Sequence, residues 1–177
     1  MAASKPLAVR MLEQRGIAHE VVAFDPAIRD AVEVARATGH APETVYKTLV
    51  VEDDAARGKP RLIMVPSNAQ LDLKALAAAV GVKRLRMSSH RDAERHTGLQ
   101  VGGISALALI GKGFVIYIDA ACEQLDHILV SAGQRGIDVR LTVADLLALT
   151  GATPVAGCTA TLRPPPETSS PLPVANS

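Results

Sequence analysis

The sequence predicts a single α/β domain, of the α+β kind, built from a mixed β-sheet with helices packed on it. Its 177 residues fall within the roughly 100–200 residues that form one domain. Hydrophobic residues make up 48% and charged residues 21%, which is a globular balance. Some of the short β-branched runs are joined by tight turns and others by helical segments. This alternation favours a mixed sheet over a doubly wound parallel one.

Capping residues mark where the predicted helices begin and end. Asp30 and Asp72 each precede an amphipathic run, and Gly39 and Gly81 stand where those runs stop. Asp is a favoured N-cap, and Gly readily adopts the left-handed conformation that ends a helix. Helices are therefore expected over residues 6–16, 30–39 and 72–81, within 83–98, after 119 and over 142–151. The last of these opens on Thr142-Val-Ala-Asp145, which resembles a capping box.

The predicted strands are short runs rich in β-branched residues, and they cover 19–24, 45–51, 61–65, 114–118, 128–130 and 136–141. The second and third of these runs flank a charged turn and should form a hairpin. We assign residues 1–153 to the domain and 154–177 to a mobile tail. The tail contains Pro164-Pro-Pro166 and a Ser/Thr/Pro run, a composition that cannot bury a core.

The charge balance excludes one class of function. Lys and Arg total 19 and Asp and Glu total 18, a formal charge of +1. A protein that coats nucleic acid through charge alone needs many more cations, because its affinity grows with the phosphates neutralised. Transient binding to one end of an RNA is still compatible with this charge.

Cysteine spacing and hydropathy indicate the compartment. Cys122 and Cys158 form no CxxC and no metal-ligand spacing, so we expect free thiols in a reducing environment. The sequence shows neither the apolar run of a signal peptide nor the ~18 apolar residues of a membrane span. We expect a cytoplasmic protein with no membrane association.

The sequence matches none of the familiar catalytic motifs in full. A phosphate-binding P-loop around Gly111-Lys112 would need Gly at position 106 and Ser or Thr at 113, where the chain has Ala106 and Gly113. No G-x-G-x-x-G stands at a strand-to-helix turn, and no serine lies in a G-x-S-x-G elbow. The five histidines show no ligand spacing, so no metal is expected. If the protein is an enzyme, its chemistry needs little acid–base machinery.

Four segments, taken together, carry a more specific pattern. They are Val45-Tyr-Lys-Thr-Leu-Val50, Val65-Pro-Ser-Asn-Ala-Gln-Leu-Asp-Leu-Lys74 with Gly81-Val-Lys83, Thr97-Gly-Leu-Gln-Val-Gly-Gly-Ile-Ser105, and Val130-Ser-Ala-Gly-Gln-Arg-Gly-Ile-Asp138. In this order and spacing they resemble the YbaK/EbsC family of aminoacyl-tRNA deacylases, which is related to the editing domain of bacterial prolyl-tRNA synthetase. The likeness runs from about Leu7 to Gly151.

The resemblance implies a barrel-like mixed sheet flanked by helices, and an enzyme that removes a mischarged amino acid, above all Cys from tRNA for proline, without a cofactor or metal. It implies the 3′ end of aminoacyl-tRNA as partner, with prolyl-tRNA synthetase as a second partner. The implied site has Lys47 as its key polar residue and Gly102 and Gly103 as backbone N–H donors. Around them the implied pocket residues are Thr48, Ser105, Ser131 and Asp138.

This site suits the chemistry. An aminoacyl ester is already activated, so a few preorganised donors beside it can supply much of the rate. A Gly-Gly pair lets the backbone approach the carbonyl closely, and a buried lysine can hold a phosphate or ribose oxygen. In a cysteinyl substrate the thiolate itself can attack the ester, which would explain the absence of a protein nucleophile.

Other readings of the same residues stay open. Alone, Lys47 reads as a lysine at a solvent-facing strand edge and Gly102-Gly103 as a bulge or turn. A basic cluster either touches the acceptor stem or forms a solvated helix face; it consists of Lys83, Arg84, Arg86, Arg91 and Arg95. Ala106 stands where the family loop commonly has Pro, which bears on whether Cys is the substrate. The alternatives are a deacylase for Ala or Ser, or a non-catalytic module that binds tRNA or a synthetase.

Overall fold

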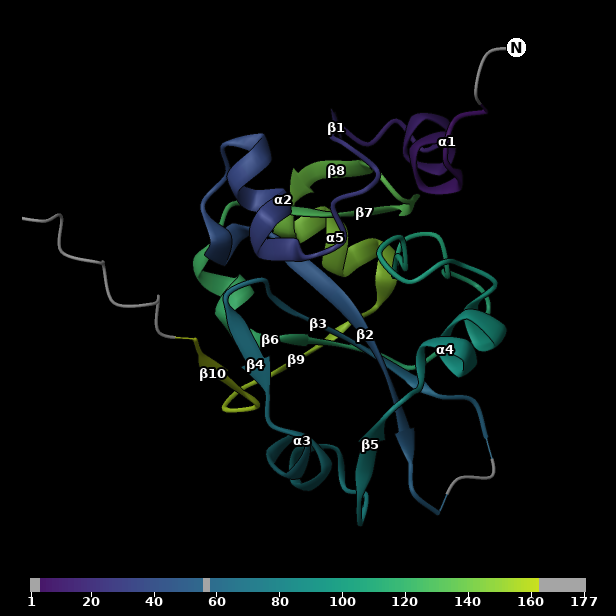
Figure 1. The fold of residues 1–177 in the computed structure, drawn as a ribbon, viewed down its shortest axis with the longest axis vertical. Helices are drawn as coiled ribbons and strands as arrows, with labels where there is room; N and C mark the ends of the chain where they lie inside the picture. Colours follow the sequence, from purple (N-terminus) through teal and green to yellow (C-terminus); the bar gives the residue numbers. More distant parts are fainter. Residues whose placement is uncertain (1–3, 56–57, 163–177) are drawn as a thin grey trace, which may run out of the picture.

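The computed structural model describes residues 4–55 and 58–162 (Figure 1). Its helices are α1 (Leu7–Gln14), α2 (Ala31–Thr38), α3 (Leu73–Val80), α4 (His90–Thr97) and α5 (Val143–Thr150), with short 3-10 turns η1 (Pro42–Thr44) and η2 (Ala120–Gln124). The strands are β1 (Glu20–Ala23), β2 (Tyr46–Asp53), β3 (Arg61–Pro66), β4 (Ala69–Leu71), β5 (Leu85–Met87), β6 (Ile116–Asp119), β7 (His127–Gln134), β8 (Ile137–Thr142), β9 (Thr153–Val155) and β10 (Thr159–Thr161). No helix in the described part of the chain combines the length and hydrophobicity needed to cross a bilayer.

The strands form a five-stranded sheet in the order β5-β2-β3-β6-β9, a three-stranded sheet β1-β8-β7 and a pair β10-β4. The pairs β3–β6 and β6–β9 are parallel and the others are antiparallel. The predicted mixed α/β architecture is therefore confirmed. In Figure 1 the three-stranded sheet lies in the upper half, and β5 and α3 lie at the lower end.

The barrel-like closure implied by the resemblance is wrong, because the sheets do not join into a ring. Strand β5 pairs only with residues 51–53 of β2. At the other end, Val45, the residue just before β2, forms a single parallel bridge with Leu129 of β7. Between these two points the outer edge of β2 faces neither strand, and this gap becomes the wall of a cavity.

The helix caps follow the sequence closely. The Asp30 carboxylate accepts hydrogen bonds from Val32 N–H and Glu33 N–H, and Asp72 accepts one from Ala75 N–H. Thr142 likewise caps α5 through Asp145 N–H at 3.1 Å. These bonds satisfy amide groups that the first turn of a helix cannot pair internally.

Aliphatic side chains fill two main cores, as the scarcity of aromatics requires. The larger lies between the sheets and under α1 and α5, and includes Leu12, Leu62, Met64, Ile118 and Leu146. The smaller lies on the other face of the hairpin β2–β3, where Ile63 and Val65 pack against Leu76 of α3. The alternation along β3 places neighbouring residues in different cores, as the two-residue period of a strand dictates.

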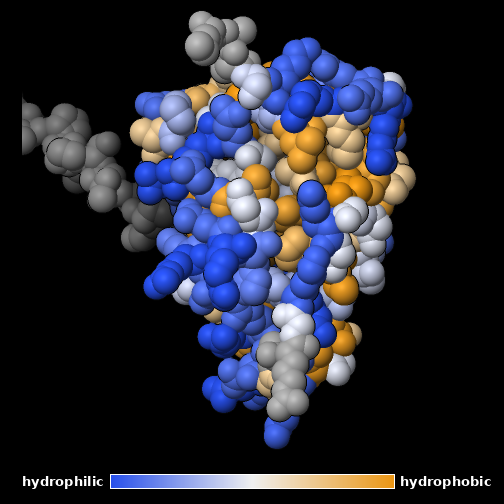
Figure 2. Space-filling model, turned by 90° about the vertical axis from the view of Figure 1, so that its right-hand side faces the viewer, coloured by the Kyte–Doolittle hydropathy of each residue, from blue (hydrophilic) through white to orange (hydrophobic). Residues whose placement is uncertain are grey.

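The exposed surface also has a more hydrophobic and a more hydrophilic part. The side of the molecule that carries α1 and α4 is seen directly in Figure 2, where hydrophobic side chains gather in the upper part and hydrophilic ones dominate below. In α1, Ala8, Val9 and Leu12 are buried, while Leu7 remains 49% exposed. The amphipathic helix therefore covers the core with one face only.

The sequence suggested that the chain leaves the domain at residue 154, but the chain remains packed on the domain beyond that point. Residues 153–155 continue the main sheet beside β6, and residues 159–161 pair with β4. Cys158 is fully buried, and its backbone oxygen accepts a hydrogen bond from Asp72 N–H at 2.7 Å. Sequence reasoning missed these strands because each has three residues, too few to show a period. The rest of the expected tail, residues 163–177, lies outside the described residues.

This docking predicts different outcomes for two truncations. A chain ending at Gly151 loses β9, β10 and the buried Val155 and Cys158 side chains, so its free energy of unfolding should fall by several kcal/mol, at roughly 1.5–3 kcal/mol per buried side chain. A chain ending at Leu162 keeps every described contact and serves as the control. Urea unfolding measures both; equal stability of the two chains would show that the last strands contribute nothing.

Candidate active site

A cavity of about 240 Å³ opens beside the unpaired edge of β2. Its walls come from the start of α2, strand β2, the junction of β5 and α4, residues 101–104, and the facing strands β7 and β8. Of the predicted site residues, Lys47, Thr48, Gly102, Ser131 and Asp138 line the cavity. Three parts of the chain that are distant in sequence thus meet at one place: strand β2, the loop at Gly102 and the hairpin β7–β8.

Lys47 is half-buried on β2, opposite Val65 of β3. Burial lowers the pKa of its ammonium below the usual value, and the nearby Asp30 carboxylate partly opposes that shift. Among the described residues no carboxylate lies within salt-bridge distance of Lys47. A partly desolvated cation without an ion-pair partner is suited to bind an anionic or carbonyl oxygen of a ligand.

Ser131 and Asp138 are register partners on the antiparallel strands β7 and β8, so their side chains leave the same face of the sheet. Asp138 is only 7% exposed, and burial raises its pKa to about 7. No described residue donates a hydrogen bond to its carboxylate. Ser131 Oγ accepts a hydrogen bond from Gly133 N–H at 3.2 Å. A carboxyl group that titrates near neutral pH inside a cavity is a candidate for proton transfer or for binding an ammonium group.

Gly102 and Gly103 differ in what they can do. Gly102 lines the cavity with a φ of 91°, a conformation that favours glycine. Gly103 does not line it, and its N–H already donates to Gln100 O at 2.8 Å. Of the two expected donors, Gly102 is therefore the one that lines the cavity, and the N–H of Gly103 is already paired within the loop.

Gly103 has a structural reason to be glycine. A Cβ there would lie 2.9 Å from Arg135 N and 3.0 Å from Gln134 C, backbone atoms where β7 ends and the turn to β8 begins. We predict that Gly103→Ala lowers the free energy of unfolding by about 1–3 kcal/mol, the usual range for overpacking, and lowers activity with it. Gly58→Ala is the control, because nothing lies within 4 Å of its Cβ. Thermal unfolding compares them; an unchanged Tm for Gly103→Ala would contradict this account.

Ser105 also lies outside the cavity. It is buried, and its Oγ accepts a hydrogen bond from Ala108 N–H at 3.2 Å, as an N-cap does. Ala106 then occupies the position after a cap, where proline fits best. The Ala that replaces the family Pro is itself buried and does not line the cavity.

The cavity wall also includes polar side chains that sequence reasoning did not assign to the site, among them Arg29, Asp30, Ser88 and His90. Asp30 was recognised only as a helix cap. Arg29 and His90 stand next to helix starts and belong to no motif. Ser88 lies between a strand and a helix, where polar residues are common, so its position in the sequence gave no signal.

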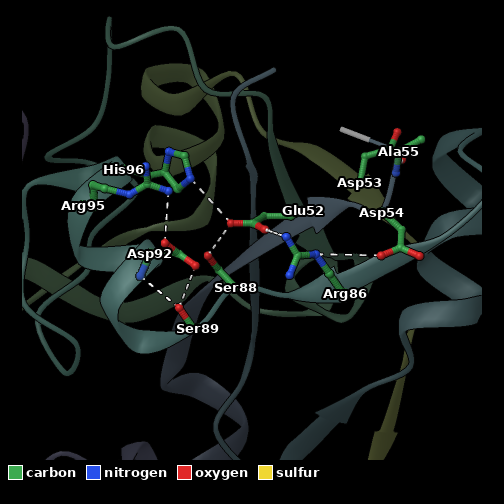
Figure 3. A network of polar contacts seen from close by, with 10 residues as sticks. All are labelled: Glu52, Asp53, Asp54, Ala55, Arg86, Ser88, Ser89, Asp92, Arg95 and His96. Atoms are coloured by element: carbon green, nitrogen blue, oxygen red, sulfur yellow. Dashed lines mark hydrogen bonds and ion pairs between the residues drawn. The ribbon is translucent and has the colours of Figure 1, made fainter. Parts of the chain in front are cut away.

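Ser88 connects the cavity to a polar network (Figure 3). Its Oγ donates to Glu52 Oε1 at 2.8 Å, and the same carboxylate pairs with Arg86 at 2.6 Å and lies 3.5 Å from His96 Nε2. Glu52 is buried, so these contacts compensate the loss of water around its charge. The network fixes the wall where β5 meets α4.

The same contacts bear on the basic cluster that the sequence singled out. Arg84 lies 3.7 Å from Asp54, Arg86 pairs with Glu52, and Arg95 pairs with Asp92 at 3.0 Å. These arginines are thus partly neutralised on the protein's own surface, which favours the solvated-face interpretation. Among the described residues, no group of three or more His, Cys, Asp or Glu is placed to hold a metal.

The class of protein follows from the sequence and the mixed α/β fold together. The sequence model described as the aminoacyl-tRNA editing domain matches residues 25–149. The chain belongs to this family.

Individual proteins give the same result. The chain is 34% identical over 148 residues to a protein of Enterococcus faecalis, EbsC, whose name marks it as a candidate Cys-tRNA(Pro)/Cys-tRNA(Cys) deacylase; the match covers 82% of this chain and 88% of that protein. A solved candidate trans-editing enzyme for prolyl tRNA synthetase is similar with a TM-score of 0.72 and 27% identity, covering 87% of this chain and 98% of the other. Hypothetical protein APE2540 shares the fold, with a TM-score of 0.75 and 22% identity over 86% of this chain and 98% of that one.

Proposed function

We propose that this protein is a trans-editing deacylase, which cleaves the ester between a mischarged amino acid and the 3′ end of a tRNA. The observation that carries the proposal is the convergence of Lys47, Gly102, Ser131 and Asp138 on one cavity in a chain of the editing family. The 3′ end of aminoacyl-tRNA is the partner on this account, and prolyl-tRNA synthetase is the source of the mischarged product.

The size of the cavity supports a small amino acid. At about 240 Å³ it falls below the roughly 300–1,000 Å³ of pockets for drug-sized ligands. We therefore propose cysteine on tRNA for proline as the substrate, in line with the name of the Enterococcus relative. Alanine and serine are smaller still, so size alone does not reject them, and the choice must come from polar contacts.

Each group of the cavity has a role in the cleavage. Gly102 N–H stabilises the negative charge that grows on the carbonyl oxygen of the ester in the transition state. Lys47 adds a positive charge beside the same ester. Asp138, once ionised, binds the substrate ammonium or takes the proton of the attacking water. Water then replaces the tRNA hydroxyl at the carbonyl, and the products are the free amino acid and a tRNA with its terminal hydroxyl restored.

A panel of aminoacylated tRNAs tests this proposal. Purified protein should deacylate Cys-tRNA(Pro) well above the spontaneous rate and spare Pro-tRNA(Pro), while Ala-tRNA(Pro) and Ser-tRNA(Pro) rank the alternatives. The Lys47→Ala protein, prepared identically, controls for contaminating hydrolases. If no mischarged tRNA is cleaved faster than in buffer, the chain is a binding module and the proposed activity is wrong.

A further inference from the structure

Two arginine side chains flank Gly102 at the cavity. A Cβ built on Gly102 would lie 3.5 Å from Arg29 Cγ and 3.5 Å from Arg135 Nε. Arg29 comes from the segment before α2 and itself lines the cavity, while Arg135 comes from the β7–β8 turn. The two side chains thus approach one glycine from different parts of the fold.

Neither arginine is neutralised by the described protein. Arg29 and Arg135 have no carboxylate within 4.0 Å among the described residues, whereas Arg84, Arg86 and Arg95 each have one. Arg135 donates through Nε to Val101 O at 2.8 Å, which anchors its side chain on the same loop. No described residue accepts a hydrogen bond from its two terminal nitrogens. That leaves the terminal fork of the guanidinium for a ligand.

The surrounding charges decide the kind of ligand. Asp30 and Asp138 line the cavity together with Lys47, so its interior offers both signs and suits an amino acid. The Arg135 guanidinium adds positive charge beside Gly102, near the place proposed for the ester, and the Arg29 side chain passes the same glycine. A guanidinium group matches the oxygens of a phosphate in geometry and charge.

We propose that Arg29 and Arg135 bind a backbone phosphate of the terminal nucleotides of the tRNA, and that this grip sets the ester against Gly102. The inference rests on the proposed deacylase function, since it names how the same site holds the RNA. On this proposal the RNA contacts the rim of the cavity rather than the basic cluster of residues 83–95.

Two variants remove the charges with little other change. Arg29→Ala deletes an exposed side chain with no described hydrogen bond, and Arg135→Gln removes the charge while its amide can still donate to Val101 O. Arg84→Ala is the matched control, because it removes an exposed arginine of the other cluster. Circular dichroism and thermal unfolding confirm that each variant is folded.

Binding of a CCA trinucleotide with a 5′ phosphate tests the interaction without any catalysis. For each arginine variant the affinity should fall by roughly 10–100-fold, the effect of losing a hydrogen bond to a charged group. The slope of log K against log salt should flatten by roughly 0.7 for each phosphate that the variant no longer neutralises. Arg84→Ala should match the unmodified protein. Equal affinities for all proteins, or an equally large decrease with Arg84→Ala, would overturn the proposal.

Deacylation separates this inference from the proposed function. On aminoacyl-tRNA, Arg29→Ala should lower kcat/KM by a factor at least ten times larger than on an aminoacyl ester of adenosine, which has no phosphate. Equal decreases on both substrates would place the arginines at the ester and overturn the phosphate role. If the unmodified protein cleaves neither substrate but binds the phosphorylated trinucleotide through these arginines, the deacylase proposal fails and the phosphate site stands.

Discussion

Replacing Lys47 by alanine is expected to slow deacylation by about 10²–10³-fold, the usual effect of removing one electrostatic interaction with the transition state. The fold should remain intact, because the described structure gives Lys47 no ion pair to lose and burial already disfavours its charge. Stability should even rise slightly, since a desolvated ammonium is removed from a strand. The expected pattern is an inactive but stable protein.

Single-turnover deacylation and thermal unfolding, measured on the same preparation, check this result. Lys74→Ala is the control, because it removes a lysine on the exposed side of α3, away from the cavity. Lys47→Arg keeps the charge but changes its shape, so partial activity there would point to electrostatics. Full activity of Lys47→Ala would exclude Lys47 from catalysis, and loss of both fold and activity would make it a structural residue.

The elements with strong local signals were predictable from the sequence. Asp30 and Asp72 cap the starts of helices α2 and α3, and Gly39 and Gly81 cap their ends, as expected from the sequence. The hairpin β2–β3 also formed as predicted, because a run of β-branched residues returned after a charged turn. These features depend on residues close in sequence, which local chemistry alone determines.

Features that depend on distant parts of the chain were not predictable. Strands β9 and β10 owe their positions to β6 and β4, far away in the sequence. Whether the sheets close into a barrel depends on how β2 approaches β7, which no local pattern encodes. The open arrangement matters for function, because a closed sheet would have paired the edge of β2 that now lines the cavity.

The candidate site shows the same limit. Motif order singled out Lys47, Gly102 and Asp138, and the fold brings them to one cavity. The motif could not tell Gly102 from Gly103, because the difference lies in a hydrogen bond to Gln100 and in the close approach of the β7–β8 turn. Arg29 could not be found either, since its significance comes only from the loop that folds against it.

The second large expected effect is a pH dependence of activity, which we assign to Asp138. Burial raises its pKa to about 7, so the carboxylate that binds an ammonium or activates water exists fully only above that pH. We expect kcat/KM to rise with pH through about 7 and then level off. Asp138→Asn should abolish this inflection and lower the plateau rate by roughly 10²–10⁴, the contribution typical of a general base. An unchanged pH profile in the variant would assign the inflection to another group.

The same carboxyl group should make the stability of the protein change with pH in the direction opposite to the activity. Its pKa is higher in the folded protein than the ordinary 3.8 of an unfolded chain, so the folded state binds the proton more tightly and stability falls as pH rises between the two values. Between pH 5 and pH 8 the decrease amounts to about 3 kcal/mol, at 1.36 kcal/mol per unit of pKa. Asp138→Asn should remove this decrease, which urea unfolding of both proteins at the two pH values measures. Activity that rises over the pH range in which stability falls, with both trends absent from the variant, would identify Asp138 as the buried carboxylate that the site keeps at the expense of the fold.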